Sequence, residues 1–485
     1  MNPNNSSPVN WLKNIGSLSA FRVLEYILPL ITFPIVVRVL GPDIYGKWVY
    51  TQTVVSFFSL AANLGLISYG QRQIAAYQET ASELIPSLLS MRVFLSILTY
   101  AILAGTLFLF PTDHTTQWLI LIFGFTLVMN SIYNLDWILS GLQRFDKIAL
   151  LQAIGQIISL GGIVLFLRRP ENAWLLPSLV CLGTFLAGLW GWRWLHREGI
   201  RMRISLSFAR WWKILRVSLY YSFASFMSLI YGKADHLILS WLKGDHALGD
   251  YGACYRLMGA FMGFVMIGTS VIVPYAAAVS AKEPKRFGEV IRKGLLVLMA
   301  ISLPVAVAAI VLSRDIVLLI LGEQYGGSTN LFRVLATIIP LGAFSSFFAG
   351  TLLFASGHHR RYAFTVSMGA IVNMIGNLLL IPSWGGMGAA IATALAQGTV
   401  ALCAIYLGRQ YLSRVFSRSL LHSFAATAAL YALLSVSGES PFVLRLLAGG
   451  GIYFLVLWVL DRKDGRELSH LLGNSVWRHA PGLIP

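Results

Sequence analysis

The residues best able to do chemistry in this sequence are ionisable side chains that stand alone in long apolar stretches. Arg22 and Glu25 lie three positions apart, and Lys233, Asp235 and Arg256 follow much later in the chain. An arginine can hold a phosphate through two parallel hydrogen bonds, and a carboxylate in an apolar segment can carry a proton. These residue types therefore indicate binding of an anion and movement of a small ion.

Composition identifies the elements that must position these side chains. Of the 485 residues, 56% are hydrophobic and 12% are charged, whereas soluble proteins carry roughly 25% charged residues. A bilayer core about 30 Å thick needs roughly 20 apolar residues in a helix, because lipid offers the backbone no hydrogen bonds. The clearest uncharged runs are 93–110, 115–135, 148–167, 172–191, 257–281, 294–313 and 334–357. A longer run, 362–408, is interrupted at Pro382 and must make two crossings.

With weaker spans near 15–40, 48–71, 217–241, 420–436 and 445–460, the sequence predicts an all-α integral membrane protein of about fourteen transmembrane helices. Lys and Arg concentrate in alternate loops, including 193–216 and 282–293, and Arg72 and Arg92 are expected in cytoplasmic loops of the same series. Because cytoplasmic loops carry the excess of Lys and Arg, both termini are predicted to be cytoplasmic, in a bacterial inner membrane.

The net charge of +17 does not indicate nucleic-acid binding, since the basic residues lie in short gaps between apolar runs. The cysteines, Cys181, Cys254 and Cys403, are far apart in apolar runs and are expected to pack in the core. Neither a metal site nor a cofactor is expected. In the basic stretch 193–216, aromatic and apolar residues alternate with Lys and Arg, which is typical of a helix lying on anionic lipid headgroups. An unstructured basic connector is the alternative.

An internal repeat relates two loops in the sequence. Gly41-Pro-Asp-Ile-Tyr-Gly-Lys-Trp and Gly244-Asp-His-Ala-Leu-Gly-Asp-Tyr share a glycine, an apolar residue, a second glycine, a charge and an aromatic in the same order. Glycine is favoured where a turn needs positive φ or where two backbones approach closely. The repeat predicts two lobes of about seven spans, although chance similarity between membrane turns remains an alternative.

At these motifs the chain resembles the polysaccharide transporter (Wzx or RfbX-like) family of the multidrug/oligosaccharidyl-lipid/polysaccharide (MOP) superfamily. The resemblance rests on the loop around Gly41, on the segment from Asp235 to Leu257 and on the segment from Ile371 to Thr393. It implies two pseudo-symmetric lobes around a central cationic cavity, as in MATE-like folds. The expected divisions are an N-lobe at 1–192, a linker at 193–216, a C-lobe at 217–408, two further helices at 409–460 and a cytoplasmic tail at 461–485.

The resemblance implies outward movement of an undecaprenyl-diphosphate-linked oligosaccharide by alternating access, coupled to protons or sodium. Arg22, Lys233 and Arg256 match the family's cationic helices by position and are expected to hold the diphosphate, with Tyr251 and Tyr255 beside the glycan. The candidates for ion coupling are Glu25, Asp235 and Asp136. The second span offers only Gln52 and Asn63, which departs from more basic relatives. Expected partners are the lipid-linked oligosaccharide, anionic membrane lipids, and polymerase and glycosyltransferases of the same pathway.

Structural roles compete with each of these interpretations. Arg22 and Glu25 can form an ion pair, His236 can be a hydrogen-bonded packing residue, and Asp136 can cap a helix or contact a loop. A drug or metabolite antiporter and a lipid II flippase are the rival transporters. A membrane glycosyltransferase or polymerase is the enzymatic rival, but the non-cytoplasmic loops are short and Asp113 and Glu171 lack a paired carboxylate.

Overall fold

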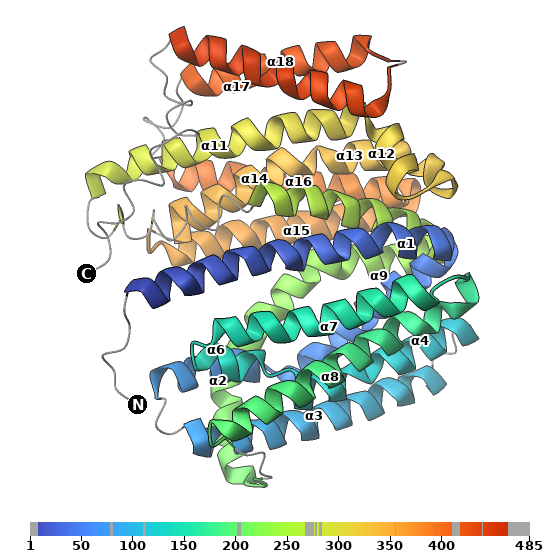
Figure 1. The fold of residues 1–485 in the computed structure, drawn as a ribbon, viewed down its shortest axis with the longest axis vertical. Coiled ribbons are helices and arrows are strands. Elements are labelled where there is room, and N and C mark those ends of the chain that lie inside the picture. The colour runs from blue at the N-terminus through green and yellow to red at the C-terminus, as the bar shows by residue number, and fades with distance from the viewer. Residues whose placement is uncertain are drawn as a thin grey trace. The chain divides into compact units, whose positions relative to one another are not determined.

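The protein is described from a computed structural model, in which residues 8–77, 81–109, 113–200, 205–266, 276, 279–280, 284–354, 356–409, 418–438 and 440–463 are described. The side chains of residues 8–30 lie outside this description. The described chain is helical, which confirms the predicted fold class (Figure 1).

The helices of the first half are α1 (Pro8–Asn63), α2 (Leu66–Ala76), α3 (Ala81–Leu109), α4 (His114–Gly124), α5 (Thr126–Tyr133), α6 (Asp136–Gly141), α7 (Phe145–Phe166), η2 (Pro170–Trp174), α8 (Leu175–Arg197) and α9 (Phe208–Met266). Those of the second half are α11 (Pro284–Val311), α12 (Ser313–Ile320), η3 (Glu323–Ser328), α13 (Thr329–Ala336), α14 (Ile338–Phe347), η4 (Phe348–Phe354), α15 (His359–Trp384), α16 (Gly386–Leu407), α17 (Arg418–Val436) and α18 (Phe442–Lys463).

Among the described residues, nine helical stretches are long and apolar enough to cross a bilayer. Two bent pairs also qualify, residues 31–63 with 66–76 at 48° and residues 208–223 with 225–266 at 41°. The chain is therefore a multi-pass membrane protein, and the count is consistent with the fourteen spans expected. The predicted division of 362–408 is confirmed, because α15 ends and α16 begins around Gly385, whose φ is 55°.

The chain divides into two compact units, unit 1 (Met1–Gly249) and unit 2 (Asp250–Pro485). In unit 1, α7 packs against α8 and α1, while α1 also packs against α3 and α4. Side-chain contacts fix the first part of α9 to the same unit, since Arg72 donates to the hydroxyl of Tyr221 at 2.9 Å. The basic stretch 193–216 is divided between the end of α8 and the start of α9. The lobe boundaries expected from the sequence stay a prediction.

Unit 2 is built around α14, α15 and α16, with α11 beside them. Figure 1 shows α17 and α18 packed together beside α11, at the edge of this unit. The Tyr453 hydroxyl on α18 donates to the Ala300 carbonyl of α11 at 2.7 Å, and Arg445 forms an ion pair with Asp315. These two polar contacts tie α18 to α11 and α12, and α17 packs between α18 and α11 through contacts with both.

Candidate functional site at the paired turns

The first glycines of the two loops of the repeat have nearly the same backbone conformation. Helix α1 is interrupted at Gly41 with φ 68° and ψ 172°, and α9 is interrupted at Gly244 with φ 81° and ψ −177°. Side chains rarely adopt this left-handed φ, so each loop requires glycine at this position. Residues 41–46 and 244–249 are called the paired turns below. Their common geometry confirms the repeat that the sequence predicts.

The paired turns pack against each other reciprocally within unit 1. A Cβ atom added to Gly46 would lie 1.8 Å from the carbonyl oxygen of Asp245. A Cβ atom added to Gly249 would lie 1.8 Å from the carbonyl oxygen of Pro42. The repeat aligns Gly46 with Gly249 and Pro42 with Asp245. The two contacts are therefore equivalent and are related by a pseudo-two-fold axis.

Polar contacts surround this backbone contact. Asp43 and His246, which are 203 positions apart and equivalent in the repeat, approach to 3.1 Å between Oδ1 and Nδ1. Lys47 donates to Asp113 at 2.6 Å, and Asp113 caps the start of α4. Burial raises the pKa of Asp245 above its ordinary range; Lys47 opposes this, and the nearby carboxylates add to it. The end of unit 1 that holds these residues is called the turn end.

Lys233 lies between the two helical segments that lead away from the paired turns. Its ammonium donates to the Ser56 hydroxyl at 2.8 Å, and Ser56 donates in turn to the Gln52 carbonyl at 2.6 Å. Lys233 precedes the break at Gly244 by 11 residues, which is about 16 Å at 1.5 Å per residue. If the paired turns lie at the surface of a hydrocarbon layer about 30 Å thick, the ammonium is near the middle of that layer.

Asp235 and His236 form a buried pair on the same helix. Their side chains are 4% and 9% exposed, and Oδ1 of Asp235 lies 2.7 Å from Nδ1 of His236. The same oxygen accepts the backbone N–H of His236 at 2.9 Å. His236 is thus hydrogen-bonded inside unit 1, and its imidazole lies directly beside the Asp235 carboxylate.

The other predicted binding residues lie in unit 2 or outside the described side chains. Tyr251 is fully buried and packs beside Gly386, which has no side chain. The Tyr251 ring lies 5.6 Å from that of Tyr255. Arg256 is exposed. Tyr251 can therefore contact a ligand only if this packing changes. The side chains of Arg22 and Glu25 lie outside the described residues.

Asp136 is the first residue of α6, directly after a break in a membrane span. Helix α5 ends at Tyr133, and Asn134 accepts the backbone N–H of Asp136 at 3.2 Å. The Asp136 carboxylate accepts a hydrogen bond from Gln152 at 3.0 Å. This arrangement holds the carboxylate between α6 and α7 at the end of unit 1 opposite the turn end.

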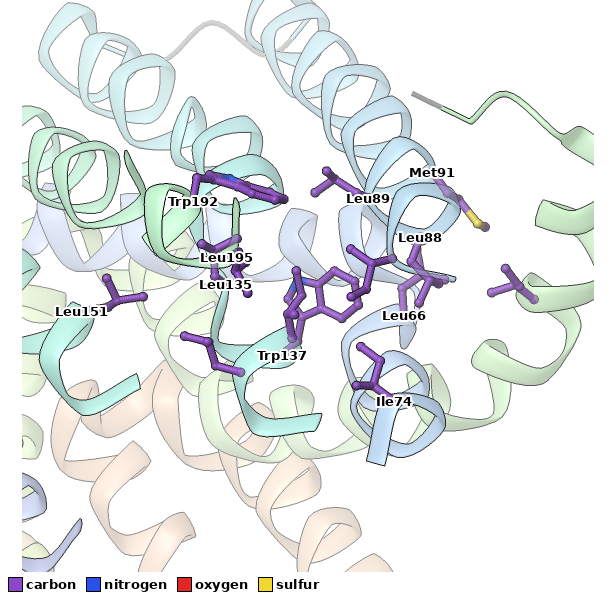
Figure 2. Close-up of a cluster of buried hydrophobic side chains, with 14 of the residues drawn as sticks. Leu66, Ile74, Leu88, Leu89, Met91, Leu135, Trp137, Leu151, Trp192 and Leu195 are labelled. Carbon is purple, nitrogen blue, oxygen red and sulfur yellow. The ribbon is translucent and has the colours of Figure 1, made fainter. Parts of the chain in front are cut away.

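Arg92 is a functional candidate that the sequence placed wrongly. It lies within α3 and is 4% exposed, not in a cytoplasmic loop. One nitrogen donates to the Asn130 carbonyl at 3.2 Å, and the guanidinium lies 5.3 Å from the centre of the Trp137 ring. Figure 2 shows Trp137 amid the buried apolar side chains of this region. The signal in the sequence was the apolar run from Leu84, which begins well before Arg92.

Arg92 lies beside the break between α5 and α6, in the fourth predicted span. A helix end leaves carbonyl groups without partners inside the helix, and lipid cannot supply them. The Trp192 indole donates to the carbonyl of Ile132 at 2.7 Å, and Arg92 donates a second hydrogen bond to the carbonyl of Asn130, which also accepts the backbone N–H of Asn134. The guanidinium and the indole thereby stabilise the broken helix from two neighbouring helices.

The sequence of this chain is similar to those of proteins that are named as transporters and flippases. The family model described as polysaccharide biosynthesis protein matches residues 11–280, and the MatE model matches residues 221–383. A protein of Escherichia coli (strain K12) named "Putative O-antigen transporter" is 19% identical over 394 residues, which are 80% of this chain and 94% of that protein. A Haloferax volcanii protein named as a probable low-salt glycan biosynthesis flippase is 25% identical over 260 residues, 53% of this chain and 54% of that protein.

Solved structures show the same fold. The lipid II flippase MurJ in an inward closed conformation superposes with a TM-score of 0.74 and 15% identity, covering 92% of this chain and 99% of that chain. An inward-facing multidrug resistance MATE family transporter of the MOP superfamily gives a TM-score of 0.58 and 16% identity, covering 80% of this chain and 95% of that chain. The chain therefore belongs to the polysaccharide biosynthesis protein family and has the fold of the MOP superfamily.

Proposed function

We propose that this protein is a flippase that moves an undecaprenyl-diphosphate-linked oligosaccharide to the outer leaflet by alternating access. The glycan would serve the biosynthesis of O-antigen, capsule or exopolysaccharide. Family membership, the names of the bacterial and archaeal relatives and the fold shared with a lipid II flippase support this function. The protein moves its substrate without a covalent step, in a bacterial inner membrane with both termini cytoplasmic.

Lys233 is the observation that carries the proposal. Holding an ammonium near the middle of a bilayer costs several kcal/mol, so such a residue is retained for a function. The Ser56 hydroxyl accepts a hydrogen bond from the ammonium at 2.8 Å and holds it between α1 and α9. A diphosphate that enters the membrane between α1 and α9 would meet this positive charge and offset part of its desolvation.

The remaining roles follow the same chemistry. Arg22 and Arg256 would complete the diphosphate site, and Tyr255 would contact the glycan. Asp235 is the first candidate for ion coupling, because His236 can share a proton with its carboxylate. Glu25 and Asp136 are further candidates, and the coupling ion is a proton or sodium. Anionic lipids and the polymerase and glycosyltransferases of the pathway are the proposed partners.

Replacing Lys233 by alanine tests the proposal. In cells whose surface glycan depends on this protein, we expect Lys233→Ala to lower glycan display at least tenfold while the amount of protein in the membrane stays unchanged. Ser56→Ala is the matched control, since it removes the same hydrogen bond but keeps the charge. It should retain at least half of the display, measured by glycan immunoblotting against protein level.

Equal loss in both variants would assign Lys233 a purely structural role and contradict the proposal. The identity of the cargo is tested by depleting the protein and isolating the lipid-linked intermediate that accumulates. An accumulated oligosaccharide on undecaprenyl diphosphate supports the proposal. Accumulated lipid II would instead indicate that the protein is a lipid II flippase. If no lipid-linked intermediate accumulates, the result would favour a drug or metabolite antiporter.

Alternating access also predicts that the paired turns separate during transport. We expect the double variant Asp43→Cys and His246→Cys, in a background without the three native cysteines, to form a disulfide under oxidation, because the native side chains touch. The disulfide should stop glycan display, and reduction should restore it. Full display with the disulfide formed, as measured by gel shift, would show that the turns stay together.

A further inference from the structure

A pocket of about 580 Å³ opens beside the paired turns, at the turn end of unit 1. It is lined by Ile44 of the first turn, by Thr115 and Trp118 of α4, and by Glu171 and Trp174 of η2. Its volume lies within the range of roughly 300–1,000 Å³ that small-molecule sites occupy. Trp118 is 62% exposed and Trp174 is 49% exposed, so both rings have surface available to a ligand.

We propose that this pocket is a carbohydrate-binding subsite for the glycan portion of the transported lipid, an inference that rests on the proposed function. The lining has the two kinds of group that a sugar ring requires. A pyranose has an apolar face of C–H groups, which packs well against an indole ring. Its rim of hydroxyl groups needs hydrogen-bond acceptors and donors, which the Glu171 carboxylate and the Thr115 hydroxyl provide.

The charge of the pocket selects among ligands. The residues that line it include Glu171 but no lysine or arginine, so the lining itself offers a phosphate no cationic partner. A neutral sugar needs no such partner, and its hydroxyls can donate to the Glu171 carboxylate as charge-assisted hydrogen bonds. The pocket and Lys233 therefore divide the substrate between them, the ammonium holding the diphosphate and the pocket holding the glycan.

Two tryptophans at one end of a membrane protein are also expected from the aromatic belt at the lipid interface. In this pocket, however, the rings come from α4 and η2 and line one cavity together with an acid and a hydroxyl. Trp241 offers the contrast, because it is 71% exposed, precedes the turn at Gly244 by three residues, and is not part of the pocket lining. It provides a matched control for an interfacial tryptophan.

The position of the pocket links the glycan to the conformational change. Ile44 belongs to the same turn as Asp43, which contacts His246. The adjoining start of α4 is tied to this turn by the contact between Lys47 and Asp113. A sugar in the pocket thus touches the element that must move when the paired turns separate, and it can favour one position of that element.

The experiment uses the full-length protein in lipid nanodiscs. Methyl glycosides of glucose, galactose, rhamnose and N-acetylglucosamine are titrated and followed by saturation-transfer difference NMR. We expect at least one to bind with a dissociation constant in the millimolar range. Trp118→Ala and Trp174→Ala should each weaken that binding at least fivefold, and Glu171→Gln should weaken it about threefold or more. Trp241→Ala should leave the dissociation constant unchanged.

The inference is overturned if no glycoside binds the native protein, or if Trp241→Ala weakens binding as much as Trp118→Ala. Quenching by brominated acyl chains that is present in the native protein, absent in Trp118→Ala and not relieved by the glycosides would identify lipid as the occupant and overturn the inference as well. The lipid-linked intermediate is measured separately, in depleted cells. Glycoside binding without an accumulated intermediate would refute the flippase function and leave a carbohydrate-binding pocket with no part in transport. An accumulated intermediate without glycoside binding would refute the subsite alone.

Discussion

Replacing Gly46 by alanine is expected to reduce surface glycan at least tenfold. The new Cβ atom would lie 1.8 Å from the backbone oxygen of Asp245, a group that cannot swing away as a side chain can. Overpacking of this kind typically costs about 1–3 kcal/mol. Because the cost falls only on the arrangement in which the paired turns meet, the substitution should favour separated turns and stall the transport cycle. Glycan display against membrane protein level measures the effect.

The repeat supplies a second variant and the chain supplies a control. Gly249→Ala should reproduce the effect, because its Cβ would meet the Pro42 oxygen at the same 1.8 Å. Gly161→Ala in α7 adds the same methyl group where no atom lies within 4 Å, and it should leave glycan display unchanged. Normal display from both Gly46→Ala and Gly249→Ala would show that the close contact of the paired turns is not needed for transport.

Arg92→Ala is expected to lower the thermal stability of the protein most among the substitutions considered. The variant loses the hydrogen bond to the Asn130 carbonyl and the contact with the Trp137 ring, and it leaves a cavity in a buried region. A desolvated cation–π contact is worth about 2 kcal/mol or more, and the lost hydrogen bond to the Asn130 carbonyl, which keeps its bond from the Asn134 backbone N–H, adds roughly 1 kcal/mol. We expect the melting temperature in detergent to fall by roughly 5–10 °C.

Arg216→Ala tests whether burial causes this effect. Arg216 lies 5.3 Å from the Trp212 ring, the same distance as Arg92 from Trp137, but its side chain is exposed. An exposed cation–π contact contributes only about 0.5–1 kcal/mol. The melting temperature should therefore change by no more than roughly 2 °C. An equal fall in melting temperature in both variants would mean that burial adds nothing to the stabilising effect of Arg92.

Several features of the fold could be predicted from the sequence because they depend on neighbouring residues. A segment that must pair its own backbone in lipid needs an uninterrupted apolar run, so the break near Pro382 and the division into α15 and α16 were visible. The glycines at positions 41 and 244 marked two turns of positive φ for the same local reason. The resemblance to polysaccharide transporters rested on these same motifs.

The candidate site depended on residues that are distant in the sequence. Lys233 meets Ser56 across 177 positions, and Asp43 meets His246 across 203. No spacing rule predicts such pairs, because they form only when separate helices pack. Arg92 shows the same limit, since a basic residue near the start of an apolar run is normally expected in the adjoining loop. The side chains that line the pocket likewise come from three separate segments.

The sequence by itself determined a helical membrane protein, the positions of most spans, the repeated turns and the family. Each of these follows from the hydrophobic length of a segment or from the backbone freedom of a glycine, which are properties of a few consecutive residues. Only the tertiary structure decided that the paired turns meet backbone to backbone, that Arg92 is buried against a broken helix and that Trp118 and Trp174 share a cavity with Glu171. These depend on how helices pack, because packing brings together groups that no local pattern relates.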